Sequence, residues 1–159
     1  MRLPSASGLL APAMLLLGTP LPAPPDACKL ITLADVTTAL GRGFAKGPIS
    51  ELANSGEISS CFYRKDPKTT VAISILEGAN HSGKAAVLGR QQRYQTAGHS
   101  VAPLAGLCDA AFSVVITPSN AIVVAAKGPW QMDVQVLVSG RPNLQAAQTL
   151  TKTACGRRP

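Results

Sequence analysis

The chain has 159 residues, of which 46% are hydrophobic and 14% are charged, and this composition is typical of one globular domain. The formal net charge is +7, but the basic residues are scattered and no block of five or six like charges occurs. The composition therefore excludes a disordered chain, and without a recognition motif we expect no specific nucleic-acid binding.

Residues 1–27 predict an export segment. Arg2 supplies one positive charge, an apolar run extends from Leu9 to Leu17, and a Pro-rich stretch follows. The apolar run is too short for a stable membrane-spanning helix, so we interpret the segment as a secretory signal peptide. An uncleaved N-terminal anchor is the alternative. Residues 28–159 are then expected to form a single disulfide-stapled domain.

Three helices are predicted from capping signals and from apolar residues at helical spacing. The first covers residues 33–40, where Thr32 and Asp35 resemble a capping box. The second runs from about residue 81 to residue 94 and carries several basic side chains. The third begins near Pro142, where proline suits the first turn, and carries a cysteine at its end.

Five strands are predicted from β-branched residues, alternation and turn signals, with a shorter strand possible near residues 49–52. Residues 95–109 are predicted as a loop. In the last strand Gln131 and Asp133 alternate with apolar residues, so we expect one buried face and one wet face. The expected fold is α+β: a single antiparallel sheet of about five strands packed with three helices. The predicted strands cover residues 61–64, 70–76, 111–117, 121–127 and 131–138.

Four cysteines are present, and in an exported domain an even number predicts two disulfides. Three connectivities are possible, and we favour Cys28–Cys61 with Cys108–Cys155. The first bond would tie the start of the first helix to the opening strand, and the second would tie the last helix to the loop before the three final strands. Free buried thiols are the alternative. A zinc site is disfavoured because no CxxC or Cys/His spacing occurs.

Three short segments resemble a family of small actinobacterial cell-envelope proteins and lipoproteins of unknown function. They are Cys28–Thr32 with Ala39–Gly41, then Cys61–Tyr63, and then Leu107–Phe112. The resemblance implies an exported domain with a Mog1/PsbP-like α/β fold and a bond between the first two cysteines. It supplies no catalytic residues. Two departures are the missing lipobox before Cys28 and the cysteine at position 108, where the family pattern has glycine.

No residue pattern predicts catalysis, a metal site or a cofactor. His81 and His99 are interpreted as surface residues, because no hydrolase motif surrounds them. Asp109 stands before an apolar strand and is expected to accept backbone hydrogen bonds in a turn. Trp130 is interpreted as a core residue, with an exposed tip as the alternative.

The predicted function is that of an exported cell-envelope domain, non-enzymatic and monomeric, which binds a small ligand or an envelope component. Two alternatives remain open. One is an enzyme with an unfamiliar site near Asp109 and the basic helix. The other is electrostatic attachment to anionic envelope polymers through Lys84, Arg90 and Arg93, which would weaken with salt.

Overall fold

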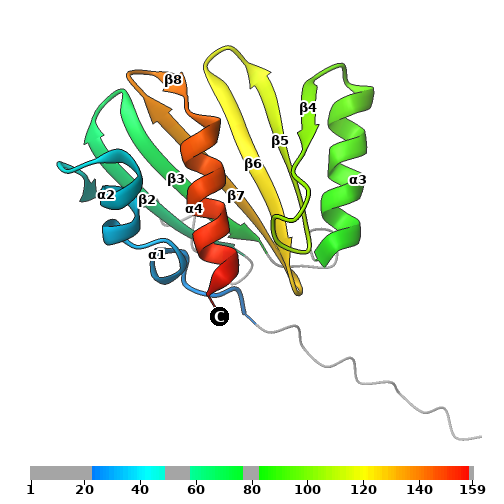
Figure 1. The fold of residues 1–159 in the computed structure, drawn as a ribbon, viewed down its shortest axis with the longest axis horizontal. Coiled ribbons are helices and arrows are strands. Elements are labelled where there is room, and N and C mark those ends of the chain that lie inside the picture. The colour runs from blue at the N-terminus through cyan, green and yellow to red at the C-terminus, as the bar shows by residue number, and fades with distance from the viewer. Residues whose placement is uncertain (1–22, 49–57, 77–82, 158–159) are drawn as a thin grey trace, which may run out of the picture.

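The computed structural model describes residues 23–48, 58–76 and 83–157 (Figure 1). These residues form four helices and eight strands, and the strands make one antiparallel sheet. The fold is therefore α+β. In chain order the elements are α1 (Ala27–Leu30), α2 (Leu33–Leu40), β1 (Ala45–Lys46), β2 (Ile58–Asp66), β3 (Thr69–Leu76), α3 (Gly83–Thr96), β4 (Ser100–Pro103), β5 (Ala110–Thr117), β6 (Asn120–Lys127), β7 (Trp130–Val138), β8 (Arg141–Pro142) and α4 (Leu144–Gly156).

The strands lie in the order β1-β2-β3-β7-β6-β5-β4, and β8 pairs with β7. The β2–β3 hairpin and the meander from β5 to β7 follow from short connections, as the sequence predicts, and β4, which lies in the predicted loop of residues 95–109, pairs with β5 at the edge. The two units are joined by antiparallel pairing of β3 with β7, in which Ile73 faces Val134. This long-range pairing makes one continuous sheet out of two local units.

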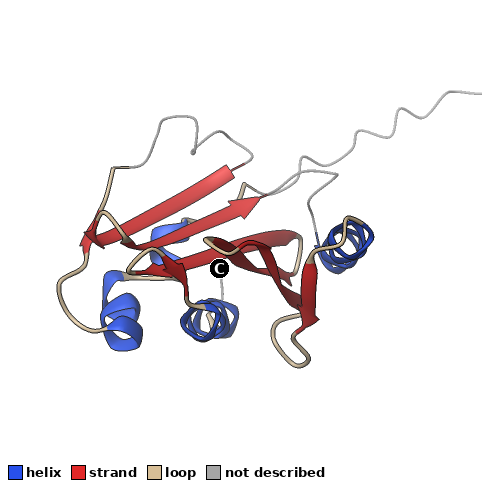
Figure 2. Cartoon of the chain, turned by 90° about the horizontal axis from the view of Figure 1, so that it is seen from above, coloured by secondary structure: helices blue, strands red, loops and turns tan. Residues whose placement is uncertain are grey.

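Helices α1, α2 and α4 cover one face of the sheet, and α3 lies on the other face beside β4 (Figure 2). The larger core lies under the three helices. It contains the alternating residues of β3 that the sequence places on one face, namely Val71, Ile73 and Ile75, and α4 adds Leu150. Trp130 is partly buried against the same core, as the core interpretation predicts.

Helix α3 forms a smaller cluster on the opposite face. Its fully buried residue is Val87, which packs with Phe112, Val114 and Val124. As a result β5 and β6 are buried on both faces. The expectation of a wet face on the last strand is wrong near α3, where Gln131 is only 1% exposed.

The predicted count of about five strands and three helices is wrong. Within the described residues the prediction lacks α1, β1, β4 and β8, each of two to four residues. Elements this short carry too little periodicity to be recognised, and sheet pairing or a cap defines them instead. The last helix begins at Leu144, with Asn143 as its cap, because Pro142 pairs with Leu137 in β8.

Several predictions lie outside the described residues. They are most of the export segment, the short strand near residues 49–52, and His81 with the start of its predicted helix. Among the helices that the structure does describe, none has the length and hydropathy needed to span a bilayer.

Candidate functional site

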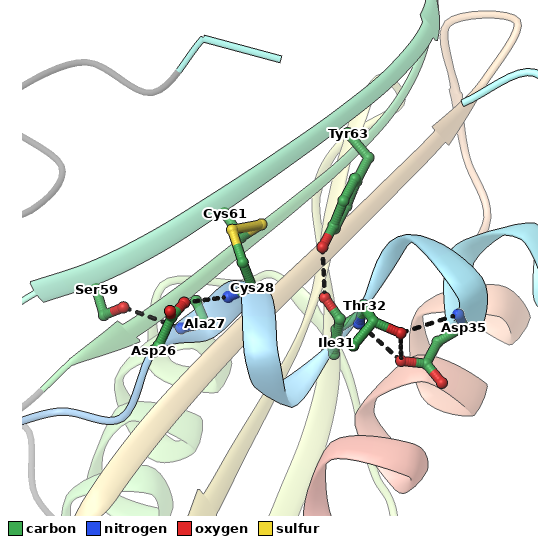
Figure 3. The surroundings of a disulfide bond; sticks show 9 residues. All are labelled: Asp26, Ala27, Cys28, Ile31, Thr32, Asp35, Ser59, Cys61 and Tyr63. Carbon is green, nitrogen blue, oxygen red and sulfur yellow. Dashed lines mark hydrogen bonds between the residues drawn. A yellow bond between two sulfur atoms is a disulfide. The ribbon is translucent and has the colours of Figure 1, made fainter. Parts of the chain in front are cut away.

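Both predicted disulfides are present, and together they use all four cysteines. The first joins Cys28 of α1 to Cys61 of β2 across a Cα–Cα distance of 5.1 Å (Figure 3). Two hydrogen bonds support it: the Tyr63 hydroxyl donates to the carbonyl of Ile31 at 2.7 Å, and the Ala27 amide donates to Ser59. The short helix α1 is thus fixed to the sheet at both of its ends.

The second disulfide joins Cys108, in the turn before β5, to Cys155 in the last turn of α4, with the Cα atoms 5.5 Å apart. Cys108 adopts a φ of 57°, in the region that favours glycine. Glycine would adopt this conformation without strain, because it has no Cβ atom. The crosslink offsets a backbone conformation that costs about 1 kcal/mol for other residues.

The start of α2 is fixed to the end of α4 by an ion pair. Arg157 donates two hydrogen bonds of 2.7 Å to the Asp35 carboxylate and a third, of 2.6 Å, to the carbonyl of Leu30. Burial alone would raise the pKa of Asp35, but hydrogen bonds from Arg157 and Thr32 outweigh it and lower the pKa to about 2. Asp35 also completes the predicted capping box.

The best candidate for a binding site is a pocket of about 460 Å³ between α3 and the sheet. Its volume lies within the usual range for small-ligand sites. The pocket is open to solvent on the face opposite to α4, so the disulfides form no part of its wall. Its lining residues are Leu76, Arg90, Arg93, Tyr94, Ala97, His99 and Asp133.

An ion pair forms the floor of the pocket. Arg90 donates to both oxygens of Asp133, at 2.9 and 2.8 Å, and both side chains are about one-fifth exposed. Gln131 donates to the same carboxylate at 3.2 Å. Burial lowers the pKa of Arg90, but the charge and hydrogen bonds of Asp133 outweigh it, so the pKa is raised and the guanidinium stays charged. These contacts hold Arg90 in place and neutralise its charge locally.

Aromatic rings form the next part of the wall. The Arg90 guanidinium lies 5.6 Å from the centre of the Tyr94 ring and donates to its hydroxyl at 3.3 Å. His99 meets the same ring edge-to-face, at 5.5 Å between centroids. Tyr94 also contacts Phe112 of the α3 cluster, so packing fixes its orientation.

Arg93 lines the rim and is exposed. Its backbone carbonyl accepts a hydrogen bond from the Ala97 amide, but within the described residues its side chain has no hydrogen bond or ion pair. Among the described residues that line the pocket, Arg93 is therefore the basic side chain without an acidic partner, in contrast to Arg90, which is paired with Asp133.

The predicted site residues are only partly brought together. Arg90 and Arg93 lie one turn apart and line the same pocket, whereas Lys84 is exposed near the start of α3 and does not line it. Asp109 lies elsewhere, and its carboxylate accepts a hydrogen bond from the Gly128 amide at 2.7 Å. This is the structural role that the sequence suggested for Asp109.

Sequence reasoning missed the role of Asp133, Tyr94 and Gln131. The alternation of the last strand predicts Asp133 on a wet face. No residue near it in the sequence indicates that a helix from elsewhere in the chain would cover it. The available signal was that Asp133 is the charged residue of a strand whose other polar residues are the uncharged Gln131 and Gln135. No group of three or more His, Cys, Asp and Glu side chains in the described part of the chain is arranged to hold a metal ion.

Comparison with protein-family models, with curated proteins and with solved structures finds no significant match to this chain. The resemblance to actinobacterial envelope proteins and the Mog1/PsbP-like fold stay predictions.

Proposed function

We propose that this chain is an exported, non-enzymatic binding domain whose pocket between α3 and β7 takes a small ligand with one anionic group and one apolar part. The observation that carries the proposal is Arg93 at the rim of the pocket: no acidic side chain among the described residues is paired with it, whereas Arg90, Tyr94, His99 and Asp133 contact one another.

The charges of the pocket favour an anionic group. Arg90 and Asp133 neutralise each other, which leaves Arg93 as the other basic side chain in the described lining. A guanidinium binds a carboxylate or a phosphate through two parallel hydrogen bonds, and no described side chain occupies the guanidinium of Arg93.

The remaining wall favours an apolar or aromatic part in the ligand. Leu76, Ala97 and the ring of Tyr94 line the same pocket. Because Tyr94 is already fixed by Arg90, His99 and Phe112, a ligand would not have to order it on binding.

The pocket chemistry supports binding rather than catalysis. The Asp133 carboxylate accepts three hydrogen bonds from Arg90 and Gln131, so it is poorly placed to act as a general base. Among the lining residues that the structure describes, none is a Ser or Cys that could act as a nucleophile. The assignment to an exported location rests on the two disulfides and on the signal-like composition of residues 1–27.

The proposal is tested by titrating isotope-labelled protein with phenyl phosphate and, in parallel, with the cation benzamidine, and recording amide and side-chain NMR shifts. Phenyl phosphate should shift resonances of Arg93, Tyr94 and His99, and benzamidine should not. Arg93→Gln should weaken phenyl phosphate binding about tenfold, because the charged hydrogen bonds are lost. The matched control is Lys84→Gln, which removes one charge from the same helix outside the pocket.

Equal binding by both variants, or shifts spread over the whole surface, would overturn the pocket assignment. The non-enzymatic part is tested separately, by assaying purified protein for hydrolase and redox turnover. Robust turnover that disappears in His99→Gln would contradict it.

A further inference from the structure

The protein has a second charged region besides the pocket. It lies at the end of the sheet opposite to the segment that leads into α1. The β2–β3 and β7–β8 turns lie at the top left of Figure 1, whereas the C-terminus and the segment before α1 lie at the bottom. Six exposed basic side chains belong to this end, and we call them the basic end: Arg42, Lys46, Arg64, Lys65, Lys68 and Arg141.

Contacts between turns bring these residues together from three separate parts of the sequence. The Gly140 amide in the β7–β8 turn donates to the carbonyl of Lys68 in the β2–β3 turn at 2.6 Å. The side chain of Lys65 lies against Gly43, in the connection from α2 to β1. In the sheet, Ala45 pairs with Arg64. The basic end is thus created by the tertiary structure and is not a run of charges in the sequence.

Little negative charge balances the basic end. Of the acidic residues that the structure describes, only Asp66 lies there, and its carboxylate already accepts a hydrogen bond from the Lys68 amide at 2.8 Å. The other four lie towards the middle or the far end, and two of them are paired with arginines. They are Asp26, Asp35, Asp109 and Asp133. The charges of the described residues are therefore unevenly distributed along the length of the sheet, which favours oriented attraction of an anionic partner.

We propose that the basic end is a docking surface for a flexible linear polyanion, such as a polymer with a phosphate in every repeat. The basic side chains surround the end of the sheet instead of lying in one plane. Lys65 lines a hollow with Ala39 and Leu40 on the face covered by α2, whereas strand alternation places Arg64 with Phe62 on the other face. A polymer can follow both faces, but a flat bilayer reaches only one of them.

This surface is distinct from the pocket of the proposed function, since no residue lines both. It also differs from the polyanion site expected from the sequence, because Lys84, Arg90 and Arg93 lie on α3 and Arg90 is neutralised by Asp133. The polyanion would be held mainly by charge, so its binding should be strongly dependent on salt.

The test measures binding of the disulfide-bonded protein to long-chain inorganic polyphosphate at several salt concentrations. The variant Arg64→Gln, Lys68→Gln, Arg141→Gln removes three charges from the basic end and leaves the packed stem of Lys65 in place. At about 0.1 M salt it should lose roughly tenfold to a hundredfold in affinity, with a shallower salt dependence. The matched control is Lys84→Gln, Lys127→Gln, Lys152→Gln, which removes three exposed charges from elsewhere.

The control triple variant should retain its affinity within about threefold. If both triple variants weaken binding equally, net charge alone explains the attraction and the proposal is wrong. Vesicles of equal parts phosphatidylglycerol and phosphatidylcholine form the second arm. Binding to these vesicles that is as tight as binding to polyphosphate, and equally sensitive to the basic-end variant, would overturn the choice of a polymer over a membrane. Unchanged circular dichroism spectra would show that the variants are folded.

Discussion

The two faces of the sheet are stabilised in different ways. On the face covered by α1, α2 and α4, packing is supplemented by the Cys28–Cys61 bond, by the Cys108–Cys155 bond and by the Asp35–Arg157 ion pair. On the other face, the contacts of α3 among residues 58–76 and 83–157 are the buried side chain of Val87 in a small apolar cluster and the ion pair of Arg90 with Asp133 of the sheet. Both disulfides anchor elements of the first face, and neither crosslinks α3.

The disulfides therefore hold the sheet and the helices of one face, whereas α3, which lines the candidate pocket, is held without a crosslink. Local stability varies within a protein, and elements that line binding sites are commonly among the less stable ones. A lightly attached α3 can adjust to a ligand while the disulfides keep the sheet in shape. Three measurements can sharpen or break this comparison.

The largest effect is expected from the second disulfide. Replacing Cys108 and Cys155 with alanine should lower the free energy of unfolding by about 4 kcal/mol, because the bond closes a long loop in the unfolded chain. Urea unfolding of the oxidised protein and of the variant measures the difference. A loss below about 1 kcal/mol would contradict the view that the crosslinks add substantially to the packing of this face.

The control for this experiment uses the backbone conformation of Cys108. The variant Cys108→Gly, Cys155→Ala lacks the same bond but places glycine at a φ of 57°. It should be more stable than the double alanine variant by about 1 kcal/mol, since alanine is strained there. Equal stability of the two variants would show that this conformation relaxes once the crosslink is gone.

An intermediate loss of stability is expected when a buried side chain is shortened in α4 or in α3, the helices that cover opposite faces of the sheet. Leu150→Ala in α4 should destabilise the protein by about 3 kcal/mol, because it leaves a cavity in the larger core. Val87→Ala in α3 removes less volume from the smaller cluster and should cost about 2 kcal/mol. Native-state hydrogen exchange should show the amides of α3 opening with a lower free energy than those of α4. Equal protection of both helices would refute the comparison.

The smallest effect is expected from the ion pair between α2 and α4. The pKa of Asp35 is lowered to about 2, so its contribution to stability is present above pH 3.8, the ordinary value, and is lost as the pH falls through 2. Because Arg157 is partly exposed, the contribution is about 1 kcal/mol. Asp35→Asn should therefore reduce stability at neutral pH and flatten its decline between pH 4 and pH 2. Urea midpoints across this range measure both effects, and an unchanged decline would refute the assignment.

Local features of the chain were enough to predict several parts of the fold. The capping box of Thr32 and Asp35, the alternation in β3 and the short connections between β5, β6 and β7 act between residues close in sequence. The disulfide partners followed from the positions of the cysteines relative to these elements. The sequence predicted a charged helix surface of Lys84, Arg90 and Arg93 but no pocket, because Leu76, His99 and Asp133, which line it with the two arginines, come from other parts of the chain.

The sequence by itself determined an α+β domain with two disulfides, since hydrophobic periodicity, turn signals and the number of cysteines can be read without knowledge of the tertiary contacts. Only the tertiary structure decided that β3 pairs with β7, that α3 covers Gln131 and Asp133, and that scattered basic residues meet at one end of the sheet. These features join segments far apart in the chain. The free energy that selects them comes from burying whole faces of elements against each other, which no short stretch of residues specifies.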